Sequence, residues 1–153
     1  MFSVQLSWQF AVGSWQKGKK MDRFKNLKVW QEAHSLVLKI YKITKDFPRE
    51  EFYGLVDQIR RAAKSIPSNI AEGNGRVYQQ EYIRFLYMAR GSLYETEYHL
   101  LLAKDLGFIN ETLYKELDEQ INLIGKLING LIRAVREGKN IKNFANRQLQ
   151  TAN

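Results

Sequence analysis

The sequence predicts an all-α protein, an antiparallel up-down-up-down four-helix bundle. Apolar residues recur at three- and four-residue steps in four long segments, whereas short alternating patterns typical of strands are few. Only two prolines interrupt the 153 residues, and 44% of the residues are apolar, enough for the core of one domain. The short connections between the expected helices favour antiparallel neighbours.

The first helix is expected from about Leu27 to Thr44, with Val29, Leu36 and Ile40 on one apolar face. Pro48 lies shortly after its last residue, where a proline restricts the preceding backbone to extended conformations. The second helix is expected to begin near Tyr53. These two segments are the first antiparallel pair of the predicted bundle.

A proline lies within the second helix, in the stretch SIPSNIAEGNG. The apolar stripe passes through Pro67 without a change of phase, which predicts that the helix continues. Pro67 has no N–H to donate to the Ala63 carbonyl, so we expect a kink there. Gly73 is expected to end the helix as a left-handed C-cap, with Gly75 in the turn that follows.

The third helix is expected from Gln79 to about Leu106 and the fourth from Asn110, a good N-cap residue. Gly107 is expected to stop the third helix. The fourth helix carries apolar residues in the 4, 3, 4, 3, 4 spacing of a bundle seam: Leu117, Ile121, Ile124, Ile128, Leu131 and Val135.

The third helix has two apolar stripes, more than one internal core requires. A surplus apolar face usually marks a subunit interface, so we expect a homo-oligomer. The residues of the second stripe are the interface candidates: Tyr82, Phe85, Ala89 and Leu100.

The formal net charge is +8, and residues 29–137 contribute nothing to it because they hold equal numbers of basic and acidic side chains. The surplus lies in the flanks, +5 in residues 1–28 and +3 in residues 138–153. Within the bundle, antiparallel topology brings one set of basic residues to one end. These nucleic-acid-binding candidates are Lys25, Lys28, Arg76, Arg84, Arg133 and Arg136. The alternative interpretation of the flanks is that they are solubilising tails.

Three regions are expected along the chain: an atypical extension over residues 1–20, the bundle over 21–137, and a basic, flexible tail over 138–153. The extension does not resemble a secretory signal, because its charges follow its short apolar run. A second methionine, Met21, is our expected physiological start. The absence of cysteine and of any apolar run long enough to span a bilayer fits a cytoplasmic protein.

Nothing in the sequence indicates an enzyme or a bound cofactor. The two histidines, His34 and His99, lack the Glu-x-x-His spacing of helical di-metal sites, so no metal is expected. Ser65 and Ser68 lack a nucleophile-elbow motif, and the Gly73-x-Gly75 pair lacks the third glycine of a dinucleotide loop. A structural role for this stretch is therefore the expectation.

The stretches SIPSNIAEG and RGSLYETE resemble the bacterial four-helix-bundle proteins encoded within intervening sequences of large-subunit (23S) ribosomal RNA genes. The resemblance covers about Phe24 to Glu137. It implies a homopentameric ring. A related branch is the accessory variability determinant of diversity-generating retroelements, a basic pentamer that binds nucleic acid and a reverse transcriptase. The resemblance brings no catalytic residues.

Two functions of different classes follow. The first is a non-enzymatic homo-oligomeric bundle, expected to be a pentamer, that binds RNA or DNA electrostatically through its basic end. The alternative is a protein-interaction scaffold or accessory subunit, for example of a reverse transcriptase, with no direct role in nucleic-acid binding. The sequence does not decide between them.

Overall fold

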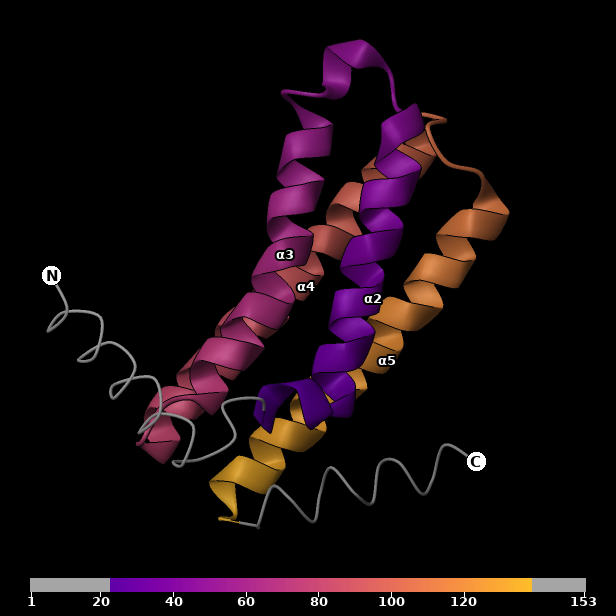
Figure 1. Ribbon diagram of the computed structural model, residues 1–153. Helices are drawn as coiled ribbons and strands as arrows, with labels where there is room; N and C mark the ends of the chain where they lie inside the picture. Colours follow the sequence, from indigo (N-terminus) through magenta and orange to yellow (C-terminus); the bar gives the residue numbers. More distant parts are fainter. Residues whose placement is uncertain (1–22, 139–153) are drawn as a thin grey trace, which may run out of the picture.

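The computed structural model describes residues 23–138, and the predicted extension over residues 1–20 and the tail beyond residue 138 lie outside these. Four long α-helices make up most of the described chain, and it contains no strand (Figure 1). The helices are α2 (Lys28–Ile43), α3 (Leu55–Asn74), α4 (Gln79–Asp105) and α5 (Glu111–Arg136). Three short 3-10 turns accompany them: Arg23–Asn26, Thr44–Asp46 and Arg49–Glu51.

Successive helices run in opposite directions and form a closed square, in which α2 packs on α3, α3 on α4, α4 on α5, and α5 on α2. The predicted four-helix bundle is therefore confirmed. Figure 1 shows that one end gathers the start of α2, the turn between α3 and α4, and the end of α5. The other end carries the α2–α3 connection and the short α4–α5 loop.

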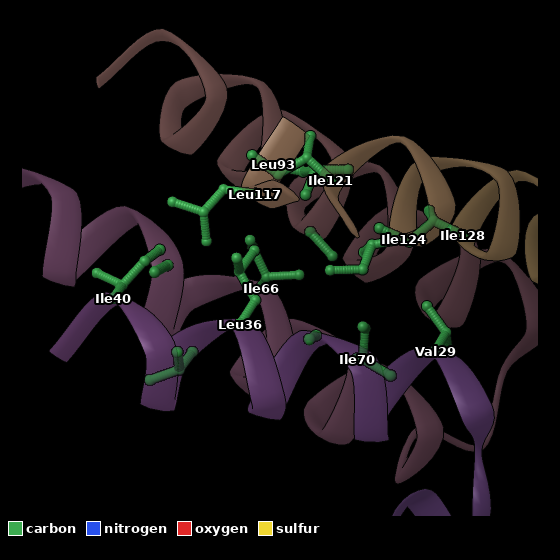
Figure 2. Close-up of a cluster of buried hydrophobic side chains, with 14 of the residues drawn as sticks. Val29, Leu36, Ile40, Ile66, Ile70, Leu93, Leu117, Ile121, Ile124 and Ile128 are labelled. Atoms are coloured by element: carbon green, nitrogen blue, oxygen red, sulfur yellow. The ribbon is translucent and has the colours of Figure 1, made fainter. Parts of the chain in front are cut away.

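The core lies between the four helices, and Figure 2 shows apolar side chains of all four meeting there. The seam predicted for the last helix is buried along its whole length, from Leu117 to Val135. Ile66 and Ile70, on either side of the proline and its polar neighbours, are fully buried as well. The largest fully buried side chains include Leu36, Ile40, Ile59, Leu86, Leu93, Leu100, Ile124 and Ile128.

The end of α4 and the start of α5 are set by Gly107 and Asn110, as predicted. Gly107, directly after the C-cap of α4, has a φ of +79°, a left-handed conformation that glycine adopts at little cost. The Asn110 side chain then accepts a hydrogen bond of 2.8 Å from the backbone N–H of Leu113. This bond satisfies one of the free donors at the start of α5.

The helix α3 continues through Pro67 without interruption, and the proline itself is buried. In Figure 1 the two halves of α3 follow different directions, as a proline inside a helix leads one to expect. The polar residues around it join α3 to α4. Asn69 donates to the carbonyl and hydroxyl of Ser65 at 2.8 and 2.9 Å, and the Ser92 hydroxyl donates to that of Ser65 at 2.9 Å.

The prediction that Gly73 is a left-handed C-cap is wrong. Gly73 lies inside α3, it is buried, and its φ is not positive. Gly75 caps the helix with a φ of −81° and donates its N–H to the Ala71 carbonyl. Glycine is required at position 73 for another reason: an added Cβ would lie 2.8 Å from side-chain atoms of both Tyr82 and Phe85 on α4.

Candidate nucleic-acid interface

The basic candidates gather at the end of the bundle where α2 begins and α5 ends. The Gln79 side chain donates to the Val135 carbonyl, which ties the start of α4 to the last turn of α5. Arg84 on α4 and Arg133 on α5 are both exposed, and among the described residues neither has a carboxylate partner. Lys25 is exposed as well. Arg84 and Arg133 are therefore available to an external anion.

Two of the six candidates are paired with an acidic residue four positions away in the sequence. Lys28 lies 3.1 Å from Glu32, and Arg76 lies 2.8 Å from Glu72. The Arg76 guanidinium also lies over the ring of Phe85, 4.8 Å from its centroid. These two candidates are already engaged with intramolecular partners, so the end of the bundle offers less free positive charge than the sequence alone indicates.

Sequence reasoning missed the residue at the centre of the arginine cluster, Tyr87. The sixth candidate, Arg136, donates from Nη2 to the Tyr87 hydroxyl at 2.8 Å. Arg90 lies over the Tyr87 ring at 4.8 Å from its centroid and donates to the Asn129 side chain at 3.1 Å. The i, i+3 spacing of Tyr87 and Arg90 is a signal in the sequence, but the contact with Arg136 depends on how α4 meets α5.

The two tyrosines near the start of α4, Tyr78 and Tyr82, have different environments. Tyr82 is buried, and its hydroxyl accepts a hydrogen bond of 3.1 Å from Asn74. Burial raises the pKa of Tyr82 above its usual value, and the bond from Asn74 acts weakly in the opposite direction. Tyr78, in contrast, lies in the turn before α4 and is 71% exposed.

The oligomer-interface candidates require correction. Tyr82, Ala89 and Leu100 are buried in the core of the single chain, so they present no surface to another subunit. Phe85 is partly buried against Gly73. The surplus apolar face of α4 lies elsewhere, on its exposed side. It consists of Tyr87, Met88, Tyr94, Tyr98 and Leu101.

Each of the two histidines contacts a residue of its own helix. His34 stacks on Trp30 with ring centroids 5.0 Å apart, and His99 lies 3.5 Å from Glu95. Across residues 23–138, no group of three or more potential ligand side chains is gathered closely enough to hold a metal ion. Within the same residues, no helix combines the length and the apolar character that a bilayer crossing requires.

The model of the 23S rRNA-intervening sequence protein family matches residues 25–130 of this chain. The chain belongs to the 23S rRNA-intervening sequence protein family. The match includes the four helices up to the last turns of α5. It also includes four of the six basic candidates, and it ends before Arg133 and Arg136.

A solved structure agrees with this membership of the 23S rRNA-intervening sequence protein family. The chain is similar to a crystal structure of a protein of unknown function from the S23 ribosomal protein family of Bacteroides thetaiotaomicron VPI-5482. The two share 25% sequence identity with a TM-score of 0.62, over 68% of this chain and 97% of the other. No curated protein matches this chain.

Proposed function

We propose that this protein is a non-enzymatic, self-associating bundle that binds nucleic acid electrostatically through its basic end, with RNA as the first ligand to test. The observation that carries the proposal is the set of exposed arginines on adjacent helices, Arg84, Arg133 and Arg136, none of which pairs with a carboxylate among the described residues. Phosphate oxygens form strong, often bidentate hydrogen bonds with guanidinium groups. The family description, which refers to 23S rRNA, favours RNA.

Self-association is supported by the exposed side of α4. Tyr94 and Tyr98 are more than half exposed, and Leu101 lies one further turn along the same side. Together they form an apolar strip away from the basic end, which another copy of the chain would remove from water. The resemblance to the intervening-sequence proteins gives the expected number of subunits, five in a ring. A ring would bring several basic ends into one rim.

Salt dependence of binding tests the nucleic-acid proposal. We expect the full chain to bind RNA and DNA, with affinity falling steeply as salt rises because each phosphate contact releases condensed counterion. The double variant Arg84→Gln, Arg133→Gln removes two free cations from the basic end. Its slope of log affinity against log salt should be shallower by about 1.4 for a single strand, ~0.7 for each lost contact.

A matched control distinguishes the effect of losing the basic end from the effect of lowering the net charge of the protein. Lys45 and Arg49 are exposed in the α2–α3 connection at the opposite end of the bundle. The variant Lys45→Gln, Arg49→Gln loses the same charge and should keep the parent slope. Equal losses in both variants would contradict a localised site. Absence of binding by the parent chain at low salt would favour the protein-scaffold alternative.

Sedimentation equilibrium tests self-association. Tyr98→Glu places a carboxylate in the exposed strip and should dissociate the assembly while circular dichroism remains that of the parent. Leu100→Glu, two residues along but fully buried, should unfold the chain instead. A parent protein that sediments as a monomer at micromolar concentrations would exclude the ring.

A further inference from the structure

Two facing segments near the basic end contain no acidic residue. On α4, residues 82–94 include Arg84 and Arg90, and on α5, residues 120–136 include Lys126, Arg133 and Arg136. We call the surface formed by Arg84, Tyr87, Arg90, Arg133 and Arg136 the α4–α5 basic face. It extends along the side of the bundle from the basic end, and each segment is bounded by an acid at both ends, Glu81 and Glu95 on α4 and Glu119 and Glu137 on either side of the α5 segment.

An aromatic ring lies within this basic face and is held by two arginines. The Arg90 guanidinium lies over the ring of Tyr87, and Arg136 donates to its hydroxyl. Tyr87 nevertheless remains 40% exposed. A guanidinium over an aromatic face is attracted to it electrostatically, so these contacts fix the ring in place without enclosing it. The arrangement combines a positioned ring with free positive charge on both helices.

We propose that the α4–α5 basic face binds a single-stranded nucleic acid, with one base stacked on Tyr87. This inference rests on the proposed function and adds to it the strandedness of the ligand and the residue that recognises it. Arg84 and Arg133 contact the flanking phosphates, together with the N–H groups of Arg136 that the tyrosine does not use. Arg90 is a positioning residue, because it is engaged with both Tyr87 and Asn129.

The site should prefer a single strand because the bases of a duplex are already stacked and paired with one another. In a duplex each base is stacked on its neighbours and paired, so stacking on a protein ring requires that a base be unstacked. A single strand presents free π-faces, and stacking a base on an aromatic side chain contributes substantially to its binding. The arginines can contact the phosphates of single strands and of duplexes alike. The difference in affinity between the two ligands should therefore come from Tyr87.

Charge argues for a polyanion on this face instead of a second copy of the chain. If the same face of two copies met, arginines would oppose arginines without an intervening acid in either segment. The exposed strip of Tyr94, Tyr98 and Leu101, proposed above for self-association, lies further along α4. Both contacts can therefore form on one helix.

The test compares full-chain variants on single-stranded and duplex ligands of 20 nucleotides, as RNA and as DNA, by fluorescence anisotropy. Tyr87→Leu removes the ring and keeps every charge. We expect its affinity for the single strands to fall about 5- to 100-fold, its affinity for the duplexes to stay within about twofold, and its salt slope to remain that of the parent. Tyr87→Phe should lose far less, because the ring is kept.

Tyr53→Leu is the matched control, since Tyr53 is 99% exposed at the opposite end of the bundle. It should bind all ligands as the parent does. The RNA and DNA arms show whether the 2′-hydroxyl contributes. The stacking site is wrong if Tyr87→Leu binds single strands as tightly as the parent does. It is also wrong if the variant's affinities for single strands and for duplexes fall by the same factor. In both cases the proposed function stands.

Two further outcomes would overturn the inference. If Tyr87→Leu changes the sedimentation of the free protein, this face is covered by a second copy. If the parent chain binds neither single strands nor duplexes at low salt, the stacking site fails together with the proposed function. The parent titration thus separates failure of the general proposal from failure of the stacking site alone.

Discussion

A Cβ built on Gly73 would lie 2.8 Å from the Cβ of Phe85, closer than side-chain atoms pack in folded proteins. Gly73→Ala should therefore push α3 and α4 apart and lower the free energy of unfolding by about 1–3 kcal/mol. Guanidinium titration followed by circular dichroism, at one fixed protein concentration, measures the change. Unchanged stability would mean that the Tyr82 and Phe85 side chains relax at no cost.

Gly91→Ala is the matched control for that substitution. Gly91 lies in the exposed middle of α4, and a Cβ added there meets nothing within 4 Å. Because alanine favours the helix over glycine by about 1 kcal/mol, this variant should be more stable than the parent. The glycine-to-alanine substitution should thus lower the free energy of unfolding at position 73 and raise it at position 91.

Alkaline pH should destabilise the protein partly through Tyr82. Burial raises the pKa of the folded Tyr82 phenol, whereas in the unfolded chain it ionises near pH 10. Above that pH the unfolded state holds fewer protons than the folded state, so the free energy of unfolding falls as pH rises. Tyr82→Phe removes this contribution, and unfolding curves between about pH 9 and 11 should show a shallower decline.

The exposed Tyr53 provides the comparison for the alkaline experiment. Tyr53→Phe should leave the pH dependence as it is in the parent. Near neutral pH, Tyr82→Phe should cost ~0.5–1.5 kcal/mol, because Asn74 loses its acceptor. If the free energy of unfolding falls with pH equally steeply in Tyr82→Phe and in the parent, Tyr82 does not contribute to the alkaline loss of stability.

The N-cap of α5 should contribute measurably to stability. Asn110→Ala removes the acceptor of the Leu113 N–H and should lower the free energy of unfolding by about 1 kcal/mol. Asn110→Asp keeps a capping oxygen and adds a negative charge at the start of the helix, so it should retain the parent stability. Equal losses in both variants would show that the side chain acts through packing and not through the cap.

Replacing Pro67 should leave the fold intact. Pro67→Ala restores the N–H that the Ala63 carbonyl lacks, and alanine is about 3 kcal/mol more favourable than proline inside a helix. The loss of buried ring atoms offsets part of this gain. We expect unchanged helical content by circular dichroism and a thermal midpoint no lower than that of the parent. Loss of helical signal would mean that the core requires the proline.

The bundle could be predicted from sequence because its signals are local. The seam from Leu117 to Val135 repeats along one face, and Gly107 and Asn110 mark the ends of two helices by their own conformational preferences. Gly73 was misassigned because a glycine near a helix end has two explanations. A left-handed cap is a local property, whereas close approach to Tyr82 and Phe85 depends on the packing of another helix.

The candidate site could be predicted only in part, for the same reason. Topology placed Arg84 and Arg133 at one end of the bundle, and the structure agrees. It could not show that Arg76 is already paired with Glu72 or that Arg136 reaches Tyr87 across helices. The two apolar stripes of α4 were likewise visible, but periodicity alone does not show how much of each is buried. Leu86 and Leu93 belong to the core, and so do Tyr82, Ala89 and Leu100 of the stripe assigned to the interface.

The pairing of α3 with α4 has a consequence for the order in which the chain folds. These helices are joined by the four residues Gly75 to Tyr78, whereas eleven residues, Thr44 to Gly54, connect α2 to α3. A short loop costs little entropy to close, and contacts near in sequence form early. We expect the α3–α4 hairpin to be structured in the folding transition state, with Gly73 and Ser65 at high φ-value positions. The stretch SIPSNIAEGNG would then act as the nucleus on which α2 and α5 assemble.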